Sequence, residues 1–137
     1  MASFQKYNAF IDALCSGAHN LKTASFKVAL TDTAPSASSD ATFSYPPPAA
    51  ANGYPSGGAT PTVTSAATAG GVFTLKLADT VFIASGGTIG PFRYVVLYNG
   101  GTSGLIGFYD YAAEVTLANT DTFTVDFDDT NGVFTVS

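Results

Sequence analysis

The chain has 137 residues, enough for one hydrophobic core and too few for two ordinary domains. Apolar residues make up 46% of it, but charged residues only 11%, against roughly 25% in a typical soluble domain. Disordered chains are poor in apolar residues and rich in charge, so this composition excludes an intrinsically disordered chain. We therefore expect one folded domain over residues 1–137.

The few charges are unevenly placed. No charged side chain occurs from Ala41 to Leu75, and Arg93 is the only one from Thr80 to Tyr109. Interfaces between proteins are depleted in charge and enriched in aromatic residues, and the chain has seven Tyr and eleven Phe. Either neighbours in an assembly cover much of the surface, or Ser, Thr, Asn and Gly hydrate it. We place the first explanation ahead of the second.

The charge pattern also excludes several partners and compartments. A net charge of −5 with five scattered basic residues argues against nucleic acid and against anionic membranes. The single cysteine, Cys15, excludes an internal disulfide. The N-terminus has no basic region followed by an apolar run, and the uncharged stretch is too rich in Pro, Gly, Ser and Thr to span a membrane. We expect the protein to be synthesised and folded in a cytoplasm.

The first predicted element is a short amphipathic helix over residues 3–16. Ser3 is a candidate N-cap and Gly17 a candidate residue after the C-cap. The apolar side chains fall on one arc at helical spacing: Phe4, Tyr7, Phe10, Ile11 and Leu14. Residues 26–31 then alternate with period two, which predicts a half-buried strand.

Residues 33–61 have no periodicity and are predicted to form a long extended arm or loop. Three consecutive prolines favour an extended polyproline II conformation and exclude helix. A connection of this length in a compact domain is generally functional or disordered. Two alternatives stay open, an ordered arm lying on a neighbouring subunit and an ordinary surface loop. If it is an arm, its candidate protein-interaction residues are Phe43, Tyr45, Pro46, Pro47, Pro48 and Tyr54.

Residues 62–137 read as short strands with turn signals every eight to twelve residues, typical of an antiparallel β-sandwich, meander or barrel. Thr62–Ala66 and Val72–Leu77 flank a predicted Gly-Gly hairpin turn, and the nearly continuous apolar run Phe92–Tyr98 predicts a central strand covered on both faces. Further strands are expected at Leu105–Tyr111 and at 122–127. The last strand, around Phe134 and Val136, is predicted to close a hairpin with the 122–127 strand.

The residues that could carry chemistry favour no enzyme. Asp126, Asp128, Asp129 and Asn131 precede Gly132, but the register of a calcium loop fails, and a solvated turn is the favoured interpretation. Cys15 and His19 are four apart, but Gly17 is expected to end the helix between them, and a supported nucleophile–base pair is missing. We predict a non-enzymatic protein without metal, cofactor or small-molecule substrate.

Several stretches together resemble a known family. They are KYNAFIDAL from Lys6, GAHNLKT from Gly17, FKVALTDTAP from Phe26, IGPFRYVVLYN from Ile89 and DTFTVDFDDTNGVF from Asp121. In this order they resemble small virion proteins of tailed bacteriophages, the head decoration or capsid cement proteins. The likeness runs nearly end to end and is weakest over residues 36–61.

The resemblance implies a structural protein on the capsid surface of a virion. Such a protein would bind the major capsid protein lattice and copies of itself, with a trimer as the expected homo-oligomer, and would stabilise the head. The alternative is a tail, neck or head-fibre component that binds a host surface glycan or protein. The family has no catalytic residues to transfer.

Overall fold

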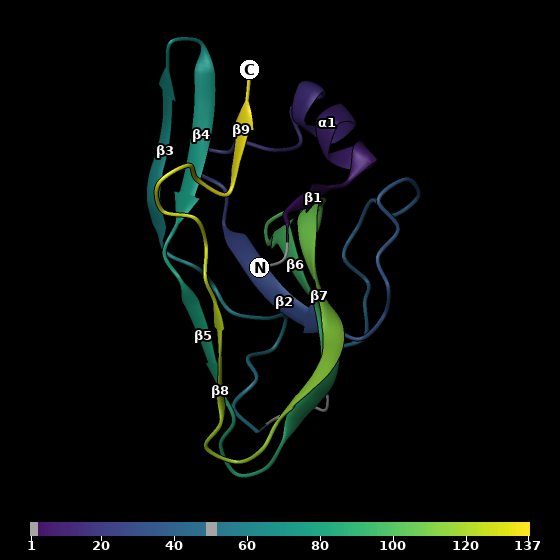
Figure 1. Ribbon diagram of the computed structural model, residues 1–137. Coiled ribbons are helices and arrows are strands. Elements are labelled where there is room, and N and C mark those ends of the chain that lie inside the picture. Colours follow the sequence, from purple (N-terminus) through teal and green to yellow (C-terminus); the bar gives the residue numbers. More distant parts are fainter. Residues whose placement is uncertain (1–2, 49–51) are drawn as a thin grey trace.

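The computed structural model describes residues 3–48 and 52–137. Strands dominate, and the one helix among these residues lies near the N-terminus, as predicted (Figure 1). The elements in chain order are β1 Gln5–Lys6, α1 Asn8–Cys15, β2 Phe26–Thr31, β3 Val63–Ala69, β4 Val72–Leu77, β5 Thr80–Ile83, β6 Ile89–Asn99, β7 Leu105–Leu117, β8 Thr122–Val125 and β9 Phe134–Val136.

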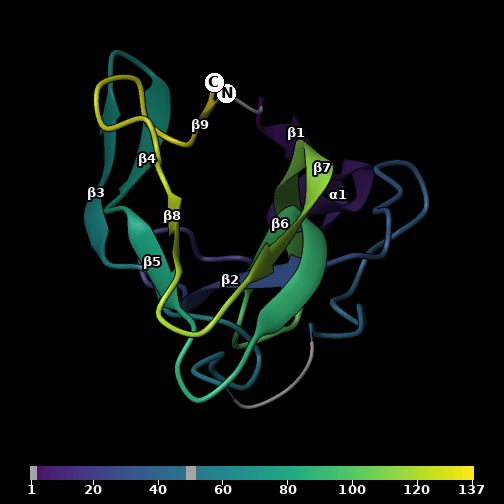
Figure 2. The same ribbon diagram turned by 60° about the horizontal axis from the view of Figure 1, so that its bottom comes forward.

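Every strand pairing is antiparallel. One sheet has the order β1-β7-β6-β2; the other strands form the sheet β3-β4-β9 and the ribbon β5-β8. The three-stranded sheet and the ribbon together form a second layer facing the four-stranded sheet, and the two layers diverge from a common end (Figure 2). The predicted mainly antiparallel β fold is confirmed as a sandwich-like arrangement. The alternative of a closed barrel is not realised by the described strands.

The core lies between the layers and follows the period-two alternation of the strands. In the four-stranded sheet Val28 pairs with Leu97, and both are buried on the inner face. From the second layer Leu75 and Phe82 point inward and are no more than 1% exposed. Among the residues that the structure describes, no Asp, Glu, Lys or Arg side chain lies in this apolar interior.

Strand β6 is central and covered on both faces, as its apolar run predicted. It lies between β7 and β2, and Val95 through Asn99 are all buried. The outer face of this stretch is covered by the segment that follows β2, described below. The predicted Gly-Gly turn between β3 and β4 is also present, with Gly70 at φ +58 and Gly71 at φ +79.

The helix is shorter than predicted. It begins at Asn8 rather than at residue 3, and Tyr7 occupies the N-cap without a side-chain hydrogen bond, so Ser3 is not the cap. Residues 5 and 6 instead pair as β1 with the edge of β7, which satisfies backbone groups that a helical first turn would leave unpaired. Gly17, at φ +86, follows the C-cap residue Ser16 as expected.

The predicted last hairpin is wrong. Strand β9 pairs with β4, with Phe134 opposite Leu75, and β8 pairs with β5. The Asp-rich loop therefore crosses from one part of the second layer to another. Phe134 gains ring contacts with Phe4 and Phe10, so β9 joins the N-terminal segment to the core.

Candidate functional site

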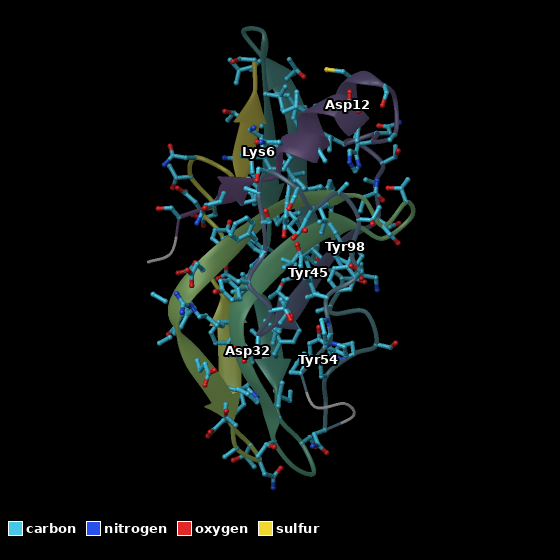
Figure 3. All side chains as sticks on the ribbon, turned by 90° about the vertical axis from the view of Figure 1, so that its right-hand side faces the viewer. Lys6, Asp12, Asp32, Tyr45, Tyr54 and Tyr98 are labelled. Carbon is cyan, nitrogen blue, oxygen red and sulfur yellow. The ribbon has the colours of Figure 1, made fainter. Side chains whose placement is uncertain are left out.

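The described parts of the predicted arm or loop, residues 33–48 and 52–61, lie against the protein's own four-stranded sheet, the first over its outer face and the second along the free edge of β2. Two isolated bridges hold them there, Thr42 with Gly104 and Val28 with Ala59. The amide of Val28 donates to the carbonyl of Ala59, and the return bond is made, both at 2.8 Å. Figure 3 shows Tyr45, Tyr98 and Tyr54 following this face of the molecule.

Tyr45 anchors the first half of the segment by a chain of hydroxyl groups. Its hydroxyl lies 3.0 Å from that of Tyr7, whose side chain is wholly buried, and it donates to the carboxylate of Asp40. Burial raises the pKa of both tyrosines, and the bond to Asp40 raises that of Tyr45 further. The same bond holds the pKa of Asp40 below its usual range. Both tyrosines are therefore neutral hydrogen-bonding groups at any physiological pH.

Tyr54 anchors the second half. Its hydroxyl accepts the backbone amide of Leu30 at 3.0 Å, and its ring stacks on Phe82 with centroids 5.7 Å apart. Phe43 is half-buried and stacks on Tyr98 at 4.1 Å, almost parallel. These aromatic side chains pack within the chain, so a partner could reach little more of them than the exposed part of Phe43.

The three prolines divide between buried and exposed positions. Pro48 is buried, whereas Pro46 and Pro47 are exposed. The carbonyl of Pro46 accepts the hydroxyl of Thr31 at 3.0 Å, which ties the proline run to the end of β2. The described part of the segment is therefore docked on its own sheet. Of the six candidate interaction residues, Pro46 and Pro47 are the ones a partner could reach most fully.

Cys15 and His19 lie in different environments, and the described hydrogen bonds do not join them. Cys15 is exposed, whereas His19 is buried and its ring lies 5.4 Å from that of Phe10. The amide of Asn99 lies 3.1 Å from Nδ1, which places the ring proton on Nε2, and Nε2 has no partner among the described residues. Burial lowers the pKa of His19. The geometry is that of a neutral packing histidine.

The Asp-rich loop is a self-contained turn. The Asp128 carboxylate accepts the backbone amides of Thr130 and Asn131 at 2.9 and 2.8 Å, and also the Asn131 side chain. These bonds hold the pKa of Asp128 below its usual range. No cluster of His, Cys, Asp or Glu suited to a metal ion occurs within residues 3–48 and 52–137.

Sequence reasoning missed the outer face of the second layer. Lys76 is the only charged side chain that its strands turn outward, within the part of the chain described. Val81 and Ile83 of β5 stand on this face, 51% and 53% exposed, opposite Thr124 and Thr122 of β8. We call this surface the neutral face. The sequence did contain a signal for this surface: residues alternate with period two in β5 (TVFI) and in β8 (TFTV), so every second side chain of each strand faces outward.

A second missed feature is a groove between β7 and β8. Its lining is Val95, Tyr109, Tyr111, Phe123, Thr124, Val125 and Asp126, and its volume is about 160 Å³. Tyr111 is 52% exposed and meets Phe123 edge to face at 5.4 Å. The lining is mostly apolar and includes one carboxylate, that of Asp126.

Comparisons with known proteins gave no match: no family model matches the chain, and no similar curated protein or solved structure is found. Within the described residues, no helix has the length and apolar character needed to cross a membrane. The resemblance to capsid decoration proteins therefore stays a prediction.

Proposed function

We propose that the protein is a non-enzymatic structural protein of a tailed-phage virion, a decoration protein that binds the outer surface of the capsid lattice and stabilises the head. The observation that carries the proposal is the neutral face. Removing water from an apolar, nearly uncharged surface costs little free energy, so such a surface suits a protein interface. A freely diffusing protein normally has charges of both signs spread over its surface. The sequence resemblance supports the same role.

The edge of the second layer supports self-association as part of this role. Strand β3 pairs with β4 on one side and with no described strand on the other, and it contains no charged residue. Unpaired, uncharged edges are templates for pairing with another strand. A homo-oligomer, with a trimer as the specific expectation, would cover this edge. Repeated contacts on a lattice would then add avidity to modest individual affinities.

Co-sedimentation with expanded capsids that lack the protein tests the proposal. The capsids come from the phage whose genome encodes this chain. Wild-type protein should pellet with them and raise their resistance to heat. The double substitution Val81→Asp and Ile83→Asp should abolish pelleting, because it would bury two unpaired charges. Ile11→Asp is the matched control, since Ile11 is 41% exposed but lies on the helix.

Failure of wild-type protein to bind any form of capsid would overturn the proposal. Unchanged binding of the double variant would overturn the assignment of the neutral face.

A second candidate function is a tail, neck or head-fibre component that binds a host glycan or protein. The exposed ring of Tyr111 beside the groove favours it, because aromatic side chains supply contact area at low entropic cost. Copy number per virion separates the two: hundreds of copies indicate a decoration protein, and a handful or dozens indicate a tail or fibre protein.

A further inference from the structure

Strand β3 has a regular backbone edge without a partner. It pairs with β4 on one side and, among the described residues, with no strand on the other. Its one irregularity lies between Val63 and Ser65, and from Ser65 to Ala69 its register with β4 is continuous. Ala67, Thr68 and Ala69 are exposed. The regular part of the strand is therefore open to an additional strand.

The hydrogen bonds of β4 show which backbone groups of β3 are free. Leu75 of β4 lies opposite Ala66, but its carbonyl accepts the amide of Val133 at 2.7 Å, on the side of β4 away from β3. Opposite residues of an antiparallel pair alternate between bonded and non-bonded pairs. Ala66 and, two residues on, Thr68 therefore turn their N–H and C=O groups to the free edge, whereas those of Ala67 face β4.

The side chains of β3 do not protect this edge. Proteins usually protect the edges of their sheets with a Lys, a Pro, a bulge or a covering segment. The free edge of β2 is covered at Val28 by Ala59, and that of β7 is interrupted where Ala112 adopts φ +67. The sequence of β3, VTSAATA, contains neither a charge nor a proline. This contrast within one chain indicates that β3 is available for pairing.

A second copy of β3 is complementary to this edge. When two copies run antiparallel with Ala67 opposite Ala67, Ala66 of each copy lies opposite Thr68 of the other, and every outward N–H faces an outward C=O. A strand with charged side chains would find no counter-charge along β3, whereas a second copy introduces no charge. The turn does not obstruct this approach, since a Cβ at Gly70 or Gly71 would meet no atom within 4 Å.

We propose that β3 pairs with β3 of a second copy, antiparallel about a two-fold axis at Ala67. The sheet β3-β4-β9 then continues across the axis into its copy, and both neutral faces lie on the same side of the joined sheet. The inference rests on the self-association included in the proposed function, and it names the contact and its register. Because a two-fold contact joins copies in pairs, it links trimers of the expected kind and does not close one.

Cysteine cross-linking of the full-length protein tests this register, in a Cys15→Ser background that removes the exposed thiol. Opposite residues of a non-bonded antiparallel pair have Cα atoms about 4.5 Å apart, within the range of about 4.4–6.8 Å that a disulfide spans. Ala67→Cys should therefore form a covalent dimer on mild oxidation. Ala69→Cys is the matched control, because this exposed alanine on the same face of β3 would lie roughly 13 Å from its copy along the strand.

Two further arms check the register and the hydrogen bonds. A mixture of Ser65→Cys and Ala69→Cys proteins should form the mixed dimer, because these two positions lie opposite each other in the proposed pairing. Thr68→Pro removes an outward N–H that β4 does not use, so it should weaken self-association about tenfold or more in sedimentation velocity. Thr68→Ala keeps this N–H and should leave self-association within about twofold; circular dichroism checks that both variants are folded.

Equal cross-linking of Ala69→Cys and Ala67→Cys would overturn the pairing, because it would indicate random collision. No cross-link of Ala67→Cys, either in solution or on capsids, would also overturn it. The outcome is separable from that of the proposed function. Capsid binding without an Ala67→Cys cross-link refutes the pairing alone, and a specific cross-link without capsid binding refutes the decoration role alone.

Discussion

Tyr45→Phe should destabilise the protein more than Tyr7→Phe, although the two hydroxyl groups bond to each other. Removing the Tyr45 hydroxyl leaves that of Tyr7 wholly buried and without a partner among the described residues. An unsatisfied buried hydroxyl costs about 1–3 kcal/mol. Removing the Tyr7 hydroxyl leaves Tyr45 still bonded to Asp40, so the loss is that of one hydrogen bond, about 0.5–1.5 kcal/mol.

Urea unfolding followed by circular dichroism measures both effects. At an m-value of about 2 kcal/mol/M, a loss of about 2 kcal/mol moves the midpoint by about 1 M. The double variant leaves no orphaned hydroxyl, so its loss should be smaller than the sum of the single losses. Strict additivity, or a Tyr7→Phe variant less stable than Tyr45→Phe, would refute the hydroxyl chain as an anchor of the 33–48 segment.

Three further predictions concern other parts of the chain. The free energy of unfolding should fall as the pH drops below about 6.5, because His19 in the unfolded chain takes up a proton there, whereas burial lowers the pKa of His19 in the folded protein. Unfolding of His19→Phe measured over the same pH range should lack this loss. Gly58→Ala should destabilise by well over the ~1–2 kcal/mol that a left-handed conformation alone costs, since its Cβ would clash with the backbone carbonyl of Val28. Gly17→Ala has a positive φ but open space around the added Cβ, so its thermal unfolding should show only the smaller cost of the left-handed conformation. Cys15→Ser should change stability by less than about 0.5 kcal/mol, because the thiol is exposed; a larger change in urea midpoint would place Cys15 in the core.

The strands were predictable where periodicity is strong. The β3–β4 hairpin and the buried run of β6 followed from alternation and from Gly-Gly turn chemistry. The pairing of β9 was not predictable, because period-two patterns say which face is buried and not which strand lies alongside. The predicted start of α1 was wrong for a related reason. Residues 5 and 6 suit a helix locally, but the open edge of β7 offers them backbone partners.

The site was less accessible to sequence reasoning. Tyr45 and Tyr54 are rightly prominent in an otherwise polar, aperiodic segment, but the sequence does not say whether they meet a partner or the chain's own sheet. The structure places Tyr45 on the outer face of that sheet, and Tyr54 at its β2 edge, where the ring stacks on Phe82 of the second layer. The neutral face and the groove depend on contacts between distant segments, such as Tyr111 with Phe123. Composition predicted that uncharged surface exists, and only the fold locates it.

The most direct test of the capsid-binding role is an averaged electron cryomicroscopy reconstruction of the virion. We predict density for hundreds of copies on the outside of the capsid, with the neutral face around Val81 and Ile83 turned towards the lattice or a neighbouring copy. Density confined to the tail or a fibre, or copies on the shell whose neutral face is turned to solvent, would contradict it.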